Sequence, residues 1–406
     1  MNYSQQTLTH LTGIYDATNT TRLEALDLQR GFIMILMAFS HCREYTGINN
    51  YSNIQSTGSP VWKGQYWLDL WQQMFVSTVA AGGFFMMMGL GVFILFQARL
   101  KEGWSSTAIV HYLTLRGILL ILLQLTLLHL FEWFAMGEIY FYAGVLLSLG
   151  LCMIAAGLCL QWIHRHNQQT WGYFLPLALT FAIPLLLQWW WTQNPTSSSL
   201  WRILLITGGA SHQPFPMDIN FTPIPWFPAV AFGLFLGKLW QASGEKVFKR
   251  FGQLALLLFI TWFALRTLNL IGWCAFGDYK SPTAGETVHW ASYFSMSKFP
   301  PSIDYFLWSF AINLIGLCLW QQSLRRWPQL VLYVSPLKTF GQSALFFFIL
   351  HWFVYYGISL LITTRANTAL TMAGFWMLGL AILYPLCKQY RIFKRTKSRH
   401  SIWRMF

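Results

Sequence analysis

Long apolar stretches with almost no charged residues constrain the fold of this chain more than any other feature. Two of the densest run from Gly117 to Leu130 and from Gly144 to Leu160. Only 10% of the residues are charged, whereas soluble domains carry about 25%. Because a helix needs roughly 20 predominantly apolar residues to cross a bilayer, these stretches predict a polytopic helical membrane protein embedded in lipid.

We expect an all-α bundle of about ten transmembrane helices. The predicted spans are residues 28–45, 68–98, 108–130, 138–162, 171–191, 226–241, 252–276, 303–322, 340–362 and 368–388. The short sixth span follows a proline-rich approach, which favours a broken or re-entrant helix. Residues 1–27 are expected to form a cytoplasmic N-terminal segment, 28–388 the transmembrane domain and 389–406 a basic cytoplasmic tail.

The Lys and Arg residues predict the orientation of these spans. Most of them fall on one side, together with the basic tail, so that side and both termini are expected to be cytoplasmic. The net charge of +14 would suggest nucleic acid in a soluble protein, but no nucleic-acid-binding motif is present. On the opposite side, the long segments 46–67, 192–225 and 274–302 are rich in Trp, Pro, Tyr and Phe and predict folded caps.

The first predicted span carries ionisable residues at both ends. On a helix, Asp27, Arg30 and His41 share one face, and His41 lies roughly 16 Å from Arg30 along the axis. Ionisable groups in a span usually face a cavity or a partner. Asp27 and Arg30 suit either an interfacial ion pair or a functional site, and His41 suits either an interfacial hydrogen bond or a general base.

Six short motifs, in order, resemble those of the transmembrane acyl transferases, and most closely the bacterial domain related to heparan-alpha-glucosaminide N-acetyltransferase. They extend over residues 22 to about 355, and the Lys-aromatic-Pro-Pro-Ser motif is the most specific. Two departures are Gln29, where Leu or Phe is commoner, and Phe299 in place of tyrosine. The motifs are Leu26–Gly31 followed by His41, Gly82–Gly89, Leu115–Gly117, Asp218 to Trp226 with Gly233 and Gly237, Ser297–Ser302, and Gly341 to His351.

The resemblance implies a bundle of ten or eleven helices that binds acetyl-CoA from the cytoplasm. It also implies an acceptor on the far side of the membrane, a glycan or amino sugar with a reactive amine or hydroxyl. Such an enzyme is expected to be a multi-pass protein of a bacterial inner membrane. Whether a histidine carries the acetyl group or acts only as a base is left open, as is the oligomeric state, for which a homodimer is one alternative.

Acyl transfer requires a base, a cationic site for the CoA phosphates and space for the pantetheine arm. We expect His41 to be the base, Glu44 three residues later to orient its ring, and Asp27 and His351 to complete the catalytic set. Arg30 and Arg116 are the candidate phosphate ligands, and Arg116 equally suits a positive-inside anchor. Gly82 and Gly83 suit either the pantetheine channel or close helix packing.

Three residues on the outer side, Asp218, Trp226 and Lys298, are the candidates for acceptor binding, because aromatic rings stack on the apolar faces of sugars. Lys298 is equally consistent with a simple lid residue. No metal is expected, since the cysteines and histidines show no ligand spacing. The alternative function is a transporter for a small polar or anionic solute, which explains buried charges equally well but usually shows an inverted repeat.

Overall fold

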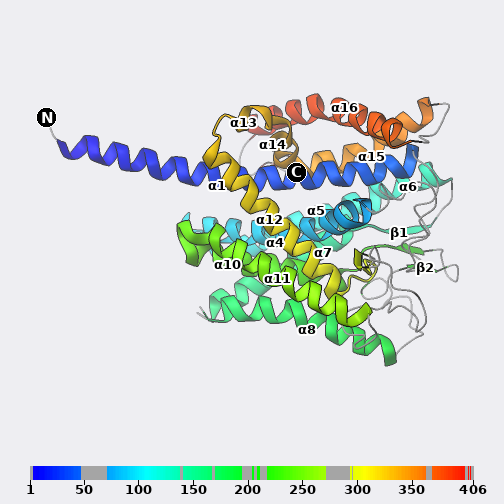
Figure 1. The fold of residues 1–406 in the computed structure, drawn as a ribbon, viewed down its shortest axis with the longest axis horizontal. Helices are drawn as coiled ribbons and strands as arrows, with labels where there is room; N and C mark the ends of the chain where they lie inside the picture. The colour runs from blue at the N-terminus through cyan, green and yellow to red at the C-terminus, as the bar shows by residue number, and fades with distance from the viewer. Residues whose placement is uncertain are drawn as a thin grey trace. The chain divides into compact units, whose positions relative to one another are not determined.

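The computed structural model describes residues 3–46, 71–137, 140–166, 170–193, 204, 208–210, 217–270, 293–294, 296–362, 368–397, 401 and 403. These residues form helices with one small sheet (Figure 1). The helices are α1 (Tyr3–Thr46), α4 (Thr78–Lys101), α5 (Ser106–Leu123), α6 (His129–Met136), α7 (Val145–Arg165), α8 (Trp171–Gln193), α10 (Pro223–Ser243), α11 (Val247–Leu270), α12 (Ile303–Arg326), α13 (Leu330–Tyr333), α14 (Ser335–Gln342), α15 (Ala344–Leu361) and α16 (Ala369–Thr396). Short helical turns are η1 (Gln72–Ser77), η2 (Gln124–Leu128) and η3 (Gly244–Lys246), and the strands are β1 (Phe141–Ala143), β2 (Gly208–Ala210) and β3 (Met217–Ile219).

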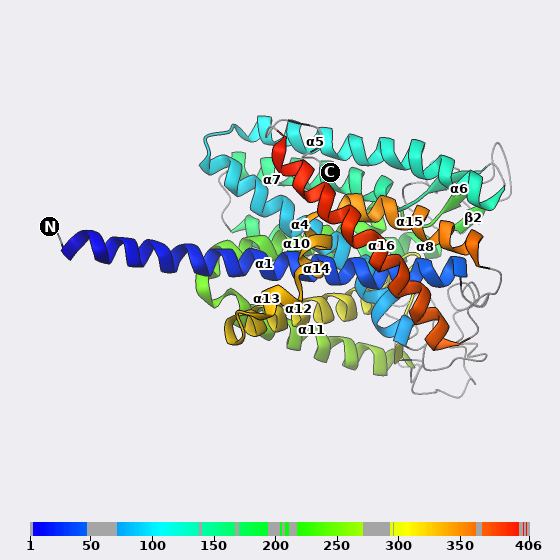
Figure 2. The ribbon, with the colours of Figure 1, turned by 90° about the horizontal axis from the view of Figure 1, so that it is seen from above.

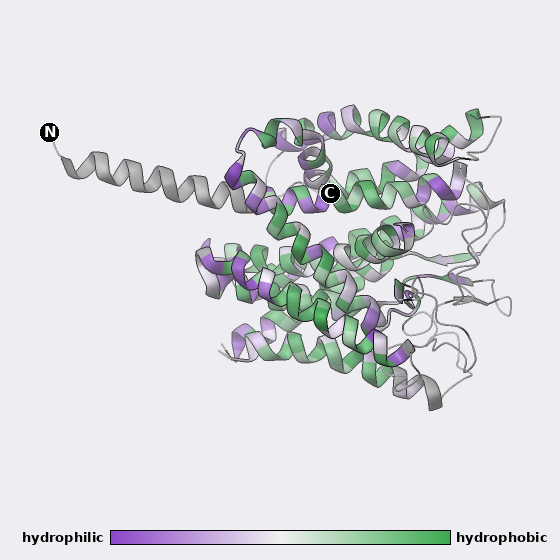
Figure 3. Cartoon of the chain, in the orientation of Figure 1, coloured by the Kyte–Doolittle hydropathy of each residue, from purple (hydrophilic) through white to green (hydrophobic). Residues whose placement is uncertain are grey.

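Within the described residues, seven helical segments are long and apolar enough to cross a membrane. Their surfaces differ: Met74–Lys101 is 72% buried, whereas Leu370–Thr396 is only 22% buried and presents most of its apolar side chains outward. Figure 3 shows the hydrophobic colouring running along these helices. The predicted all-α membrane bundle is therefore confirmed. The spans predicted at 28–45, 171–191 and 226–241 correspond to α1, α8 and α10, which are not among the seven, so the number of spans stays a prediction.

One local prediction was wrong, because residues 141–143, expected to be helical, form strand β1. The span expected over 340–362 corresponds to α15, which begins at Ala344 after the separate helix α14. The first turn of α10 contains Pro223, at a position where proline loses no intrahelical hydrogen bond. The broken or re-entrant entry expected at the sixth span stays a prediction, since Pro214 and Pro216 of its approach lie outside the described residues. Most residues of the three predicted outer caps lie outside the described residues.

Two compact units account for the contacts. The first comprises residues 1–47, 248–255 and 312–406, and the second comprises residues 48–247 and 256–311. The sequence did not predict this division, since the first unit joins the two ends of the chain.

In the first unit, α1 packs against α14, α15 and α16 (Figures 1 and 2). The contact with α14 is backbone against backbone. A Cβ atom on Gly31 would overlap the carbonyl oxygen of Leu337, and one on Gly341 would overlap that of Asp27. Deeper in the unit, the amide of Gln29 donates to Asn313 at 2.9 Å and accepts from the indole of Trp320 at 3.1 Å. These contacts fix the position of α1, which carries the first group of candidate site residues.

In the second unit, α10 lies between α4 and α8, and α5 packs on α7. Glycines again permit the close approach, because a Cβ atom on Gly89 would overlap the backbone of Val230, and one on Gly233 that of Met86. The sheet has the order β1-β3-β2, with β1 parallel and β2 antiparallel to β3. Its register places Asp218 of β3 between Tyr142 and Gly209.

A buried ionic network in the second unit joins α11 to the first turn of α12 and to the segment before it. Arg266, which is 2% exposed, contacts the fully buried carboxylate of Asp304 at 3.4 Å and donates through Nε to the carbonyl of Tyr293 at 3.1 Å. Asn269 donates to the same carboxylate at 2.9 Å. The network therefore holds the backbone that leads to the Ser297–Ser302 motif.

Candidate active-site residues

His41 lies in the last two turns of α1, where Glu44 follows it by three residues. The Nδ1 atom of His41 is 2.9 Å from Oε2 of Glu44. The continuous helix accounts for this contact, because side chains three residues apart are neighbours on a helix surface. Their side chains are 22% and 37% exposed, respectively, so both groups remain accessible.

A second imidazole lies beside the first within the same unit. His351 of α15 is fully buried, and its ring centroid is 5.1 Å from that of His41. The indole of Trp352 is closer still, with its centroid 4.0 Å from the His41 ring. The structure thus brings together three of the residues predicted to be catalytic, His41, Glu44 and His351.

The hydrogen bonding of His351 leaves one ring nitrogen available. Its Nδ1 is 3.3 Å from the carbonyl oxygen of Phe347, which can only accept, so Nδ1 carries the proton. The Nε2 atom is buried and has no hydrogen-bond partner among the described residues. A buried polar atom without a partner is uncommon and costly. This nitrogen can accept a hydrogen bond or attack an electrophile.

Asp27 and Arg30 form a separate group near the middle of α1. The guanidinium of Arg30 is 3.6 Å from the Asp27 carboxylate, which also accepts from the amide of Gln342 at 2.8 Å. Arg391 of α16 donates to Gln342 at 3.2 Å and to Thr339 at 3.3 Å. Asp27 therefore lies with Arg30 and not with His41, although the two groups share one unit.

Sequence reasoning missed Trp352, Gln342 and Arg391 as neighbours of these groups. Trp352 follows His351 directly, so an aromatic residue next to a candidate histidine was the only available signal. No signal in the sequence pointed to Gln342 or Arg391, because these residues come close to α1 only through tertiary packing.

In the second unit, Trp226 is the centre of a buried aromatic cluster. It is fully buried, stacks on Phe85 at 4.8 Å between ring centroids and contacts Phe221 at 5.0 Å. Its indole Nε1 has no hydrogen-bond partner among the described residues. Full burial of the ring and of its nitrogen makes Trp226 part of the packing of the second unit.

Lys298 and Asp218 lie near this cluster in the same unit. The ammonium of Lys298 is 4.8 Å from the ring centre of Phe299 and 5.7 Å from that of Phe221, the ring that also contacts Trp226. Asp218 precedes Phe221 by three residues and accepts from the amide of Asn220 at 3.2 Å. Lys298 and Trp226 thus both contact Phe221, in the segment that connects β3 to α10, while Asp218 lies within β3 itself.

The remaining predicted residues also belong to the second unit. A Cβ atom on Gly82 would overlap the hydroxyl of Ser309, which favours close helix packing over a channel at this glycine. Gly83 is buried beside it on α4. Arg116 of α5 is half-buried, with its guanidinium 6.0 Å from the ring centre of Tyr112. Among the described residues, no group of three or more His, Cys, Asp or Glu side chains could hold a metal ion.

Apolar helices long enough to cross a membrane define a multi-pass membrane protein. The family model for the catalytic domain of heparan-alpha-glucosaminide N-acetyltransferase matches residues 22–271, and the chain belongs to this family. It is therefore a transmembrane acetyltransferase of the N-acetyltransferase type. The match includes His41, Glu44 and Asp218 but ends before Lys298 and His351. No curated protein matches the chain at a significant level.

Proposed function

We propose that this protein transfers an acetyl group from cytoplasmic acetyl-CoA to an amine or hydroxyl of a glycan-type acceptor on the outer face of a bacterial inner membrane. The observation that carries the proposal is the contact of His41 with Glu44, next to the unpartnered Nε2 of His351. In a chain of this family, that arrangement supplies a base with a defined tautomer and a second nitrogen within reach.

The proposed chemistry begins with Glu44. As a carboxylate it accepts a hydrogen bond from Nδ1 of His41, which leaves the lone pair on Nε2. That nitrogen removes the proton from the acceptor as the acceptor attacks the thioester carbonyl. When the carbon–sulfur bond breaks, the imidazolium returns the proton to the CoA thiolate. The carboxylate of Glu44 stabilises the imidazolium between the two proton transfers.

His351 admits two roles in this scheme. Its Nε2 lone pair could accept a hydrogen bond from the acceptor, or it could attack the thioester and carry the acetyl group before the acceptor takes it. The two roles differ in one observable, since only the second leaves an acetyl group on the protein.

The donor and acceptor are assigned to the remaining residues. Phosphate binding is assigned to Arg30 in the first unit and to Arg116 in the second unit, since guanidinium groups bind phosphate through two parallel hydrogen bonds. The backbone at Gly83 would lie along the pantetheine arm. Asp218 would bind a protonated or hydroxylated acceptor, with Lys298 as a donor to its oxygens. Trp226 would support this site through packing.

The test is single-turnover chemistry with acetyl-labelled acetyl-CoA on purified wild-type protein and a His41→Ala variant. Both proteins are first checked for acetyl-CoA binding by thermal protection, because a ligand of the folded state raises the unfolding temperature. We expect the variant to keep protection but to lose CoA release with an amino-sugar acceptor by about 100-fold or more. His111→Ala, on an exposed histidine of α5, is the matched control and should stay at the wild-type rate.

Two results would count against the proposal. A His41→Ala variant that transfers acetyl at the wild-type rate would remove the assigned base. A wild-type protein that acetyl-CoA neither protects nor acetylates would favour the transporter alternative. Acetyl label retained on the wild-type protein and lost in His351→Ala would assign the covalent role to His351.

A further inference from the structure

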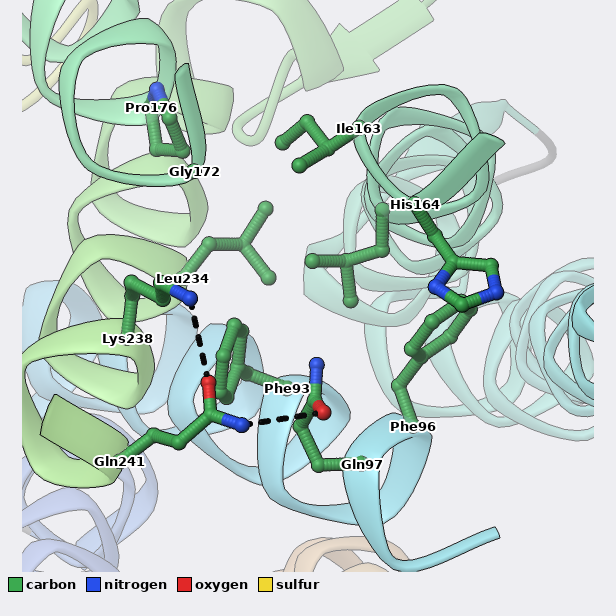
Figure 4. Close-up of a pocket in the computed structure, with 11 residues that line it drawn as sticks. Phe93, Phe96, Gln97, Ile163, His164, Gly172, Pro176, Leu234, Lys238 and Gln241 are labelled. Carbon is green, nitrogen blue, oxygen red and sulfur yellow. Dashed lines mark hydrogen bonds between the residues drawn. The ribbon is translucent and has the colours of Figure 1, made fainter. Parts of the chain in front are cut away.

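A cavity of about 190 Å³ opens within the second unit, among the ends of four helices. Part of its lining is apolar, formed by Phe93 and Phe96 of α4, Leu160 of α7, and Leu234 of α10. Figure 4 shows Phe93, Phe96 and Leu234 of this set. The rim of the cavity is polar and carries Gln97, His164, Lys238 and Gln241. None of these polar residues belongs to the candidate active-site groups described above.

The rim side chains form a directional chain of hydrogen bonds. Lys238 donates through Nζ to Oε1 of Gln241 at 3.4 Å, and Gln241 donates through Nε2 to Oε1 of Gln97 at 3.3 Å (Figure 4). Each amide oxygen of the chain therefore already accepts one hydrogen bond. N–H donors remain on the ammonium of Lys238 and on the terminal amide nitrogen of Gln97. A ligand that suits this rim must bring acceptors.

Lys238 also leaves positive charge uncompensated at the rim. It is half-buried and, among the described residues, pairs with no carboxylate; its only charge-related contact is with the ring of Tyr173, whose centre lies 5.5 Å away. Gly172 on α8 leaves room beside its stem, since a Cβ atom there would meet the Lys238 Cε at 3.5 Å. The ammonium is thus held at the opening of an apolar cavity, which favours an anion with an apolar part.

The surroundings place this opening at the depth of a membrane interface. Trp162 at the end of α7 and Trp171 at the start of α8 are 47% and 50% exposed. Exposed tryptophans gather at the level of lipid headgroups, and basic residues near helix ends mark the cytoplasmic side. Arg165 ends α7 and Arg99 lies in the last turn of α4. The anion that meets Lys238 is therefore in the headgroup layer.

We propose that this cavity binds the phosphate of an anionic phospholipid, with the glycerol and the first methylenes of one acyl chain against Phe93, Leu160 and Leu234. The cavity takes only the headgroup end of a lipid, because its volume is smaller than the roughly 300 Å³ or more of pockets that bind drug-sized ligands. Basic pockets between transmembrane helices are a known mode of headgroup recognition. The group that this cavity recognises is a phosphate ester. We assign the ester to a lipid because the opening of the cavity lies at the membrane interface. This site is independent of the acetyl-transfer chemistry proposed above.

The experiment is a thermal-shift titration of the purified full-length protein in detergent with phosphatidylglycerol, compared with phosphatidylcholine. Two variants test the rim: Lys238→Gln removes the charge, and Gln97→Glu keeps the acceptor for Gln241 but replaces the donor nitrogen with a negative oxygen. Lys101→Gln, an exposed lysine in the last turn of α4, is the matched control for charge. Helix content and elution as a single species are checked for every variant.

We expect phosphatidylglycerol to stabilise the wild-type protein saturably. In both rim variants the lipid concentration at half-saturation should be at least about tenfold higher, as expected for the loss of a hydrogen bond to a charged group. The half-saturating concentration for Lys101→Gln should stay within about twofold of the wild-type value, because the exposed charge of Lys101 lies outside the cavity. Equal stabilisation by both lipids, or unchanged half-saturation in the rim variants, would overturn the proposal.

Competition distinguishes the two sources of phosphate. We expect neither inorganic phosphate nor free CoA to displace phosphatidylglycerol. Displacement by CoA, together with weaker CoA binding in Lys238→Gln, would reassign the cavity to the nucleotide of the acyl donor and overturn the lipid assignment. Acetyl-CoA turnover by Lys238→Gln in a neutral detergent gives a separate readout, and normal turnover there with lost lipid binding is the expected pattern.

Discussion

The geometry at His41 makes one carboxylate responsible for the tautomer of the candidate base. Glu44 contacts Nδ1 of His41 at 2.9 Å, while Trp352 covers the ring at 4.0 Å between centroids. The ring is thus oriented by a hydrogen bond at one edge and by packing at its side. Removing the carboxylate should leave the ring in place but lose control of its proton.

We expect Glu44→Gln to lower kcat by about 10- to 100-fold with little change in KM, which is the usual cost of losing the partner that orients an imidazole. Glu102→Gln is the matched control, since Glu102 forms a similar pair three residues from Arg99 at 2.6 Å, away from the histidines. Steady-state kinetics on both variants check the prediction. An unchanged kcat in Glu44→Gln would remove Glu44 from the mechanism.

The buried pair of Arg266 and Asp304 yields a prediction on stability. Truncating Arg266 to Ala leaves the fully buried Asp304 carboxylate without its cation, so we expect a loss of about 3–5 kcal/mol in unfolding free energy. The Arg266→Met, Asp304→Leu double variant should recover much of that loss. Thermal unfolding in detergent measures both.

In contrast, Lys338→Gln, which breaks the more exposed pair with Glu24, should cost about 1 kcal/mol or less in unfolding free energy. Equal effects at the two pairs would contradict the argument.

At the scale of helices, glycine pairs set the distance between packed elements. The α4–α10 contact depends on Gly233, where a Cβ atom would overlap the backbone of Met86. We expect Gly233→Ala to lower stability by about 1–3 kcal/mol, because the two helices must separate. Gly374→Ala in α16 is the control, since nothing lies within 4 Å of its added Cβ. That control should be neutral or stabilising, since alanine is the better helix former. A drop in unfolding temperature for Gly374→Ala as large as for Gly233→Ala would contradict this prediction.

The helices themselves could be predicted, because apolar runs and helical spacing are local properties of the sequence. The contact between His41 and Glu44 followed from the same spacing. What could not be predicted is contact between distant segments, such as His351 beside His41 or Gln342 on Asp27. The strand at 141–143 was missed because a hydrophobic run of three residues fits a helix equally well, and its partner β3 lies far along the chain.

At the scale of the molecule, the division into two units separates the predicted residues into two sets. The first unit contains Asp27, Arg30, His41, Glu44 and His351, and the second contains the remaining predicted donor and acceptor residues. The orientation of the chain then decides which side of the membrane supplies each substrate.

The last prediction concerns that orientation. The bias of Lys and Arg predicts that both termini are cytoplasmic, so a green fluorescent protein fused after Phe406 should be fluorescent in bacterial cells, whereas alkaline phosphatase fused there should be inactive. Fusions truncated after Gly208, within a predicted outer segment, should give the opposite result. With this orientation the rim of Lys238 faces the cytoplasmic leaflet and His41 lies toward the outer side. Active phosphatase at the C-terminus would reverse both assignments, so that His41 would face the compartment that supplies acetyl-CoA and transfer across the membrane would no longer be needed.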